Sequence, residues 1–218
     1  FHYAHTHNIY SPAAFVRAYF GLGGPSMAIS SACSSGAKVF ASARRMLAAG
    51  LIDAAVVGGV DSLCLTALYG FNSLELLSQQ PCRPCDVARD GISIGEAAAF
   101  ALLERAPDTE QDLEDDAILL LGIGESSDAH HMSTPHPEGL GARAAMAQAL
   151  TTSGLDAKDI DYINLHGTGT PTSAWVRVRI TGDSDVLLYN KGAAYSGCPG
   201  GWVIDRTDDP PGRATGAG

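Results

Sequence analysis

Short apolar runs alternate along this chain with stretches of helical periodicity, and glycine, proline and charged residues separate them. This pattern is typical of a layered α/β protein. The central run at 53–61 is long enough to predict a strand that is covered on both faces. Further apolar runs predict strands at 27–31, 97–104, 118–123 and 161–165. Periodic or alanine-rich stretches predict helices at 13–20, 36–49, 63–77 (broken near Gly70) and 139–150.

The stretch from Ala28 to Gly36 contains one cysteine, Cys33, between a short apolar run and the start of a helical pattern. Small neighbours permit a sharp strand-to-helix turn, which is how many chains present a nucleophile. The N-terminus of the helix stabilises negative charge and so favours the thiolate. The alternative is that Cys33 is a small buried core residue, as most free cysteines are.

The run at 27–31, the helix after Cys33 and the run at 53–61 together predict a right-handed βαβ unit with parallel strands. Farther along, His166 leaves the predicted strand at 161–165 and enters a loop of glycine and threonine, which keeps its imidazole accessible. Glu96 stands at the edge of the run at 97–104. It is either a general base or, as we favour, a buried and hydrogen-bonded structural carboxylate.

Two patterns of metal-binding residue types lack supporting ligands. His5 and His7 alternate, but no acid or cysteine stands at a supporting spacing. Cys82 and Cys85 have C-x-x-C spacing, but a zinc site needs two more ligands. We therefore expect no metal site.

Composition narrows the class of protein. The 218 residues are 45% apolar and 17% charged, which is typical of a globular protein with a sizeable core. The net charge of −10 argues against nucleic-acid binding. No apolar run approaches the roughly 20 residues of a membrane helix, and no secretory signal opens the chain. With an odd count of five cysteines, a cytoplasmic location is the simplest expectation.

Five segments resemble, in order and spacing, motifs of the β-ketoacyl-acyl carrier protein synthases, which are condensing enzymes with a thiolase-like fold. They are 31–35 around Cys33, 56–61, 89–91 with Gly95 and Glu96, 126–129, and 166–171. Each motif alone is weak, but five in order are specific. The resemblance covers about 8–172 and implies an α/β fold with layered α-β-α architecture and a mixed sheet, of which this chain holds part.

The resemblance implies that Cys33 accepts an acyl group from the phosphopantetheine arm of acyl carrier protein. A malonyl carrier thioester then loses CO₂, and its carbanion attacks the acyl-Cys33 carbonyl. His166 matches a histidine that stabilises the enolate, and Thr168 and Thr170 match threonines that hydrogen-bond the arm. Glu96 and Asp90 match supporting acids. No metal or diffusible cofactor is implied.

The pattern departs from this family at Ser173. No histidine follows His166, and Lys191, the only later lysine, lies in no matching context. We expect a core at 1–172 and a weakly structured tail at 173–218, and a frame-shifted gene would explain the change. The family also has an N-terminal stretch that this sequence does not show.

Three functions remain open at this stage. The chain is a condensing enzyme of fatty-acid or polyketide synthesis, a defective remnant that binds acyl carrier protein or a subunit, or a Cys33-dependent acyltransferase or thioesterase. The resemblance implies acyl carrier protein as a partner. It also implies a homodimer or a ketosynthase heterodimer.

Overall fold

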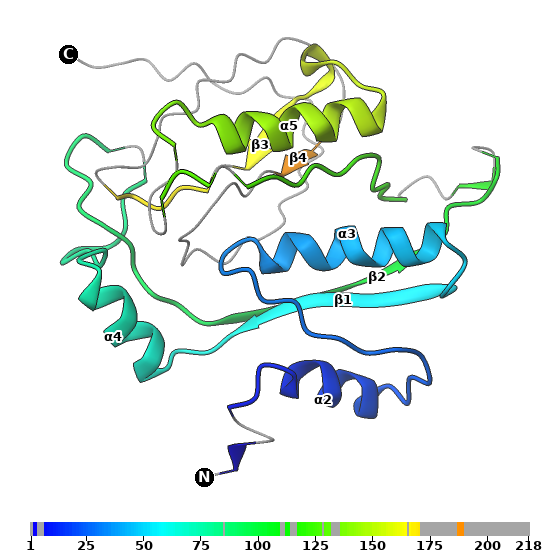
Figure 1. Ribbon diagram of the computed structural model, residues 1–218, viewed down its shortest axis with the longest axis horizontal. Coiled ribbons are helices and arrows are strands. Elements are labelled where there is room, and N and C mark those ends of the chain that lie inside the picture. Colours follow the sequence, from blue (N-terminus) through cyan, green and yellow to red (C-terminus); the bar gives the residue numbers. More distant parts are fainter. Residues whose placement is uncertain are drawn as a thin grey trace.

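Two antiparallel strands and the helix that precedes them form the centre of the molecule in the computed structural model (Figure 1). The structure describes residues 2–3, 7–84, 86–109, 112–113, 117–127, 129–131, 136–164, 166–170 and 187–189. Its elements are α2 (Ser11–Tyr19), α3 (Ser35–Ala48), β1 (Ala54–Asp61), α4 (Leu65–Ser73), β2 (Ala97–Glu104), α5 (Leu140–Ser153), η2 (Ala157–Asp159), β3 (Tyr162–Asn164) and β4 (Leu187–Tyr189). The strands predicted at 53–61, 97–104 and 161–165 and the helices predicted at 36–49 and 139–150 are confirmed, with no end displaced by more than three residues.

Strand β1 pairs with β2 along its whole length, with Ala54 opposite Glu104 and Asp61 opposite Ala97. Valines in β1 suit a pleated, partly buried surface. At the centre of the pair Gly58 lies opposite Phe100, and a Cβ on Gly58 would clash with the Phe100 ring and the Ala99 carbonyl. The glycine in β1 therefore makes room for the aromatic side chain of β2.

The prediction of a parallel βαβ unit is wrong. The segment 27–31 forms no strand, and only an isolated bridge joins Ser31 to Cys33. A strand needs a neighbour that satisfies its backbone groups, and β1 finds that neighbour in β2, which runs in the opposite direction. Strands β3 and β4 form a separate parallel pair, so the described strands make two pairs rather than one sheet.

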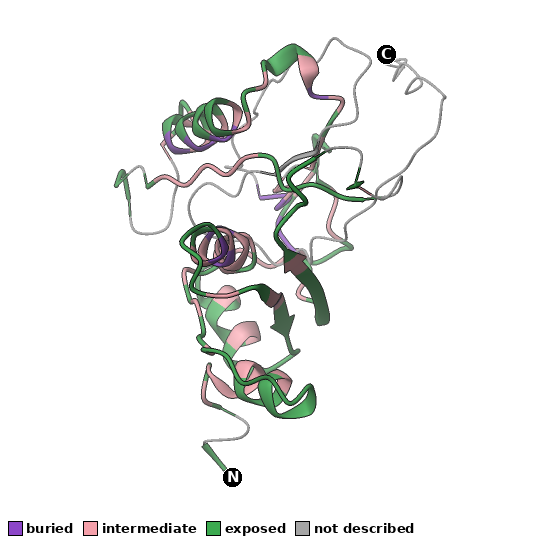
Figure 2. Ribbon diagram, turned by 90° about the vertical axis from the view of Figure 1, so that its right-hand side faces the viewer, coloured by how far each residue is buried: buried purple, intermediate pink, exposed green. Residues whose placement is uncertain are grey.

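Helix α3 packs against β1, and burial is concentrated on α3 and α5 (Figure 2). On α3 the buried residues are Ala41, Ala43 and Leu47, and Val57 is buried on β1. Beyond the end of α3, Gly50 takes a positive φ of 67°, which ends the helix at the predicted place. Small side chains on α3 therefore allow the helix to lie close to the strand.

The expectation that β1 is covered on both faces is wrong for the described residues. Only Val57 of β1 is buried, and β2 has no buried residue. Helix α2 lies on the side of the sheet opposite α3 and buries none of its own residues (Figure 1). It begins at Ser11, two positions before the helix predicted at 13–20, and ends at Tyr19. One face of the sheet is thus only loosely covered.

The predicted strand at 118–123 is also absent, because a side chain takes the place of a neighbouring strand. The Thr152 hydroxyl on α5 accepts from the Ile123 N–H at 3.0 Å and bonds the Ile123 carbonyl at 3.0 Å. Gly122 and Gly124 let this segment approach α5, and a Cβ on Gly124 would clash with the Ala145 carbonyl. The segment 117–127 is therefore held by α5 rather than by a sheet.

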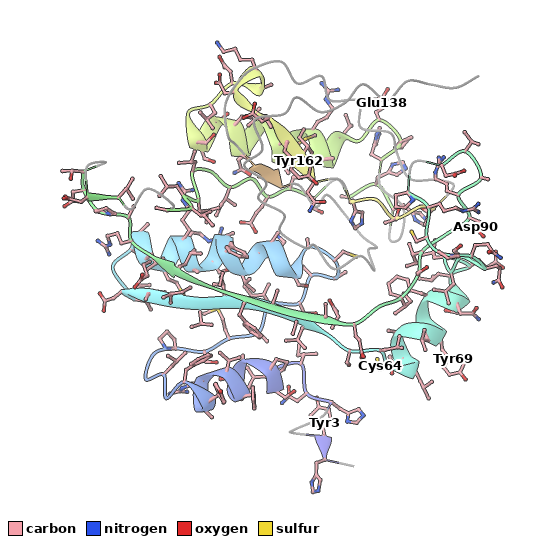
Figure 3. The ribbon with its side chains drawn as sticks, turned by 180° about the vertical axis from the view of Figure 1, so that it is seen from behind. Tyr3, Cys64, Tyr69, Asp90, Glu138 and Tyr162 are labelled. Atoms are coloured by element: carbon pink, nitrogen blue, oxygen red, sulfur yellow. The ribbon has the colours of Figure 1, made fainter. Side chains whose placement is uncertain are left out.

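Helix α4 differs from its prediction, because Leu65–Ser73 continues through Gly70 without a break. Cys64 stands immediately before α4, and Tyr69 projects from it near the edge of the molecule (Figure 3). The described part of the chain contains no helix that could cross a membrane. The expected tail at 173–218 lies outside the described residues, apart from β4.

Substitution Gly124→Ala is expected to destabilise the fold by about 2–3 kcal/mol, because backbone atoms of α5 occupy the space of the new methyl group. The free energy of unfolding from urea titration measures this. Gly70→Ala is the matched control: its Cβ meets nothing within 4 Å on α4, so it should stabilise the fold by about 0.5–1 kcal/mol. Equal midpoints for Gly124→Ala and the unchanged chain would contradict the packing described here.

Candidate functional site

Cys33 lies in a tight turn at the N-terminus of α3. The residue before it, Ala32, has a φ of 52°, a left-handed conformation that is rare for a residue with a Cβ. Three serines hold this turn. The Ser31 N–H donates to the Ser35 hydroxyl at 2.8 Å, and the Ser34 hydroxyl donates to the Ser31 carbonyl at 2.8 Å. The sharp turn predicted from the small residues is therefore present, although no strand leads into it.

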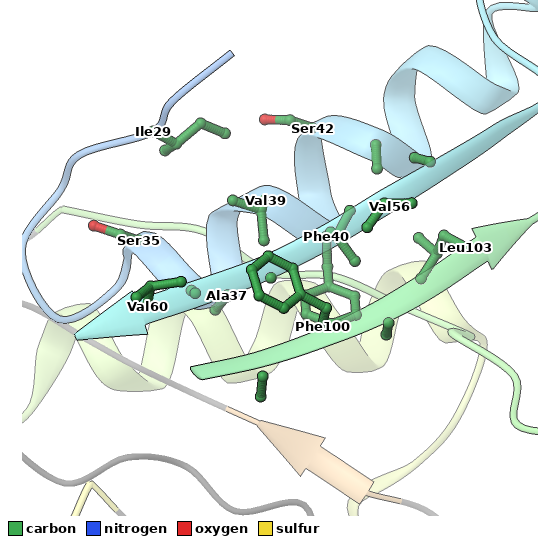
Figure 4. Close-up of a pocket in the computed structure, with 18 of the residues that line it drawn as sticks. Ile29, Ser35, Ala37, Val39, Phe40, Ser42, Val56, Val60, Phe100 and Leu103 are labelled. Atoms are coloured by element: carbon green, nitrogen blue, oxygen red, sulfur yellow. The ribbon is translucent and has the colours of Figure 1, made fainter. Parts of the chain in front are cut away.

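Cys33 is half-buried and lines a cavity of about 2200 Å³. The cavity lies along α3, β1 and β2, and Figure 4 shows Ile29, Val39 and Phe100 among its lining residues. Its volume exceeds the roughly 300–1,000 Å³ of a small-molecule pocket. The space therefore includes the loosely covered face of the sheet as well as the surroundings of the thiol.

The other predicted residues gather in the loop 166–170, which follows β3. His166 is half-buried, whereas Thr168 and Thr170 are buried and their hydroxyls lie 3.1 Å apart. One hydroxyl of this pair donates to the other, so the second keeps a donor hydrogen for another group. Gly167 and Gly169 have positive φ values of 57° and 66°, which give the loop its turns.

Asp90 is exposed at the edge of the molecule (Figure 3). Its carboxylate accepts from the Ser78 hydroxyl at 2.5 Å and from the Gln79 N–H at 3.3 Å. The hydrogen bond from Ser78, with smaller contributions from Gln79 and Arg83, holds the pKa of Asp90 below its ordinary value. These contacts tie Asp90 to the segment after α4.

The expectation that Glu96 is buried is wrong, because this residue is exposed. Its carboxylate accepts from the Leu63 N–H at 3.0 Å and so joins the start of β2 to the residues that follow β1. The pairing of β1 with β2 explains the position, because their paired ends bring 61–63 and 96–97 together. The Glu96 carboxylate is therefore hydrogen-bonded, as expected, but it is accessible to solvent.

The structure brings Thr168 and Thr170 together, and Cys82 and Arg89 contact their backbone carbonyls. Cys33 stands on a different element, and the lining of its cavity includes none of His166, Thr168 and Thr170. Within the described part of the chain, no three His, Cys, Asp or Glu side chains form a group that could hold a metal. His5 and Cys85 lie outside the described residues.

Two consecutive family models match the chain. The model of the β-ketoacyl synthase N-terminal domain matches residues 3–109, and that of the C-terminal domain matches residues 118–174. The chain belongs to the β-ketoacyl synthase family. The C-terminal match ends next to Ser173, where the sequence departs from the motifs of the family.

Curated proteins similar to this chain carry the name of a 3-oxoacyl-acyl-carrier-protein synthase. The ketosynthase chain is 38% identical over 157 residues to 3-oxoacyl-acyl-carrier-protein synthase 2 of Rhizobium meliloti, covering 68% of this chain and 37% of the relative. It is 35% identical over 166 residues to the synthase 2 of Vibrio cholerae, covering 73% of this chain and 40% of the relative. The chain thus spans about two fifths of the length of these relatives.

A ketosynthase of Xenorhabdus doucetiae, solved in complex with its chain length factor, is similar in structure. The TM-score is 0.70 at 46% identity, and the match covers 76% of this chain and 40% of the solved one. A β-ketoacyl synthase of Burkholderia phymatum matches with a TM-score of 0.68 at 32% identity, over 78% of this chain and 42% of that one. The expected thiolase-like α/β class is confirmed by these neighbours.

Sequence reasoning missed Glu125, which supports α3, the helix that follows Cys33. Glu125 accepts from Lys38 at 2.9 Å and from Arg45 at 2.6 Å, and both cations lie on α3. Burial of Glu125 by itself raises its pKa, but the hydrogen bonds from Arg45 and Lys38 outweigh that effect and hold the pKa below its ordinary value. Glu125 precedes the 126–129 motif, so this ion pair joins that motif to α3.

Substitution Glu125→Gln is expected to make the free energy of unfolding depend less on pH in the acid range. Because the folded-state pKa of Glu125 is lowered, its contribution is present above the ordinary glutamate pKa of about 4.3 and is lost as the pH falls further. Urea midpoints of both proteins between about pH 7 and pH 3 measure the difference. The two midpoints should differ at neutral pH and converge in acid. A constant difference at every pH would refute the ion-pair account.

Proposed function

We propose that this chain carries an acyl-accepting ketosynthase site with Cys33 as its nucleophile, and that the whole protein forms carbon–carbon bonds by decarboxylative condensation. The observation that carries the proposal is the turn at Cys33. A left-handed Ala32 and two hydrogen bonds among three serines hold the thiol at the N-terminus of α3, beside an open cavity, in a member of the β-ketoacyl synthase family. A half-buried thiol in that position is open to a carrier thioester.

In the first step, the Cys33 thiolate attacks the carbonyl carbon of an acyl thioester. The new C–S bond forms in this attack and places the charge on the carbonyl oxygen. When this oxyanion collapses, the bond from the carbonyl carbon to the pantetheine sulfur breaks, and that sulfur takes up the proton that the Cys33 thiol has lost. The positive end of α3 stabilises the thiolate before attack and the oxyanion during it. Backbone N–H groups of this turn are suited to that role because they need no reorganisation.

In the second step, a malonyl thioester loses CO₂ and the bonding electrons remain on its carbon as an enolate. This carbon attacks the acyl group on Cys33, and the C–S bond breaks to regenerate the Cys33 thiolate. We assign His166 to donate a hydrogen bond to the malonyl thioester oxygen as the enolate forms. Thr168 and Thr170 hold the pantetheine arm, since their hydroxyl pair retains one donor hydrogen.

A second candidate function is acyl transfer or thioester hydrolysis at Cys33 without condensation. The sequence favours it in one respect: no histidine follows His166, and Lys191 is the only later lysine. Transfer to a thiol needs a nucleophile and an oxyanion site, whereas decarboxylation also needs groups that stabilise the enolate. A chain that does neither is a remnant that binds a carrier or a subunit.

The partners we propose follow from the same site. Acyl carrier protein delivers both thioesters on phosphopantetheine, and we propose no metal or redox cofactor. The likeness to a Xenorhabdus ketosynthase solved with its chain length factor favours a heterodimer of that kind, with a homodimer as the alternative. We propose the cytoplasm as the compartment, in agreement with the free thiols of the three cysteines that the structure describes, Cys33, Cys64 and Cys82.

Incubation with hexanoyl-pantetheine tests the proposal directly. Intact mass spectrometry should show one hexanoyl adduct, and peptide mapping should locate it on Cys33. Cys33→Ala should abolish the adduct, whereas Cys64→Ala should retain it, because Cys64 is an exposed thiol outside the site. An adduct that survives Cys33→Ala would overturn the assignment of the nucleophile.

Substitution His166→Ala separates the two candidate functions. For the condensing enzyme, it should leave acylation of Cys33 intact and slow release of CO₂ from malonyl-pantetheine by about a hundredfold or more. Acylation without any CO₂ release in the unchanged protein would support acyl transfer alone. Absence of both would support the remnant.

A further inference from the structure

Three consecutive backbone carbonyls of the 166–170 loop are bound by a single segment of the chain. The thiol of Cys82 donates to the Thr168 carbonyl at 3.6 Å, and the Gly91 N–H donates to the Gly169 carbonyl at 3.0 Å. The Nε of Arg89 donates to the Thr170 carbonyl at 3.1 Å. We call these three donors, Cys82, Arg89 and Gly91, the carbonyl clamp.

The carbonyl clamp fixes the direction in which the threonine side chains point. Because the carbonyls of 168–170 face the 82–91 segment, the peptide planes cannot rotate without breaking hydrogen bonds. A Cβ on Gly169 would lie 2.6 Å from the Gly91 carbonyl and 2.9 Å from the Cys82 sulfur, so the two segments are already in contact. The hydroxyls of Thr168 and Thr170, 3.1 Å apart, are held as a pair by this arrangement.

Arg89 is the only one of the three donors that acts through a long, charged side chain. Its guanidinium is anchored at a second point, since Nη1 donates to the Asp86 carbonyl at 3.0 Å. The side chain therefore spans from its own loop to Thr170. A hydrogen bond from a charged donor is worth more than one from a neutral donor.

We propose that Arg89 is a positioning residue that orients the Thr168–Thr170 hydroxyl pair toward the pantetheine arm of the substrate. The proposal rests on the function proposed above, because it takes these threonines as the site of the arm. Arg89 itself touches no substrate. Its removal should therefore affect thioesters that carry a pantetheine arm, and spare those too short to reach the threonines.

Two thioesters of the same acyl group provide the test: hexanoyl-pantetheine and hexanoyl-N-acetylcysteamine, which lacks most of the arm. In Arg89→Ala, the KM for acylation of Cys33 by hexanoyl-pantetheine should rise about tenfold, the loss expected for one charge-assisted hydrogen bond. The KM for the short thioester should change less than about twofold. Arg89→Lys, which retains a cationic donor, should recover part of the loss.

Arg105→Ala is the matched control. Its guanidinium donates to the Leu47 carbonyl at 3.0 Å, so it also joins distant segments through a backbone carbonyl, but at the far end of α3. It should leave the ratio of the two KM values unchanged. A loss in Arg89→Ala that is equal for both thioesters, or absent for hexanoyl-pantetheine, would overturn the proposal.

Equilibrium binding of free pantetheine, measured by calorimetry, keeps this test separate from the proposed chemistry. If the unchanged protein binds pantetheine and Arg89→Ala weakens that binding about tenfold, the positioning role stands even where Cys33 accepts no acyl group. In that case the proposed function alone has failed. Pantetheine affinity that Arg89→Ala leaves unchanged, or that is absent from the unchanged protein, would refute the positioning role.

Discussion

The contact between Gly91 and Gly169 holds the 166–170 loop, which carries Thr168 and Thr170, in its place. Here the backbone of one loop donates directly to the backbone of another, at 3.0 Å. Neither residue could carry a side chain: a Cβ on Gly91 would lie 2.5 Å from the Leu76 carbonyl, and a Cβ on Gly169 would lie 2.6 Å from the Gly91 carbonyl. Their φ values of 151° and 66° also favour glycine. Both loops therefore meet because both positions lack a side chain.

This contact also explains why Asp90 and Ile92 are placed as they are. Ile92 is nearly fully buried, and its N–H donates to the Leu76 carbonyl at 2.8 Å. Asp90, one residue before Gly91, holds the Ser78 hydroxyl at the surface. The segment is thus anchored on the residues that follow α4 on one side and on the threonine loop on the other. A loop anchored at both faces can hold a substrate-binding group in a fixed direction.

Different contacts hold the turn that carries Cys33, the proposed nucleophile. Cys33 depends on a local turn of serines and on α3, whose side chains Lys38 and Arg45 join it to Glu125. The threonine loop depends on long-range contacts between loops. The candidate site is therefore made of the Cys33 turn, which local hydrogen bonds hold, and the threonine loop, which long-range contacts hold. Each can be perturbed separately, as the variants of Cys33 and Arg89 are designed to do.

Local pattern was enough to predict the parts of the fold that depend on single elements. The periodicity of α3 and α5 and the apolar runs of β1 and β2 lie within one element each, and all four are confirmed. The direction of strand pairing could not be obtained that way, because β1 and β2 are separated by a helix and several loops. The strand expected at 118–123 failed for the same reason, since a hydroxyl of α5 binds its backbone.

The candidate site also contains residues that local sequence reveals and residues that depend on distant partners. Cys33, His166, Thr168 and Thr170 were found from motifs, which are contiguous in the sequence. Glu125 was missed because its partners lie 87 and 80 positions away. Arg89 stood in a recognised motif, but its hydrogen bond to Thr170 spans 81 positions. The burial assigned to Glu96 was wrong because it depended on cover over β2 that the described residues do not supply.

Hydrogen exchange at the Gly91 amide tests the contact between Gly91 and Gly169, and it needs neither substrate nor catalysis. If this N–H is bound to the Gly169 carbonyl, it should exchange at least about a hundredfold more slowly than in an unstructured peptide. Gly169→Ala should remove that protection, because its Cβ meets the Gly91 carbonyl. Exchange of the Gly91 amide at the rate of a free peptide in the unchanged protein would show that the Gly91–Gly169 hydrogen bond does not hold the two loops together.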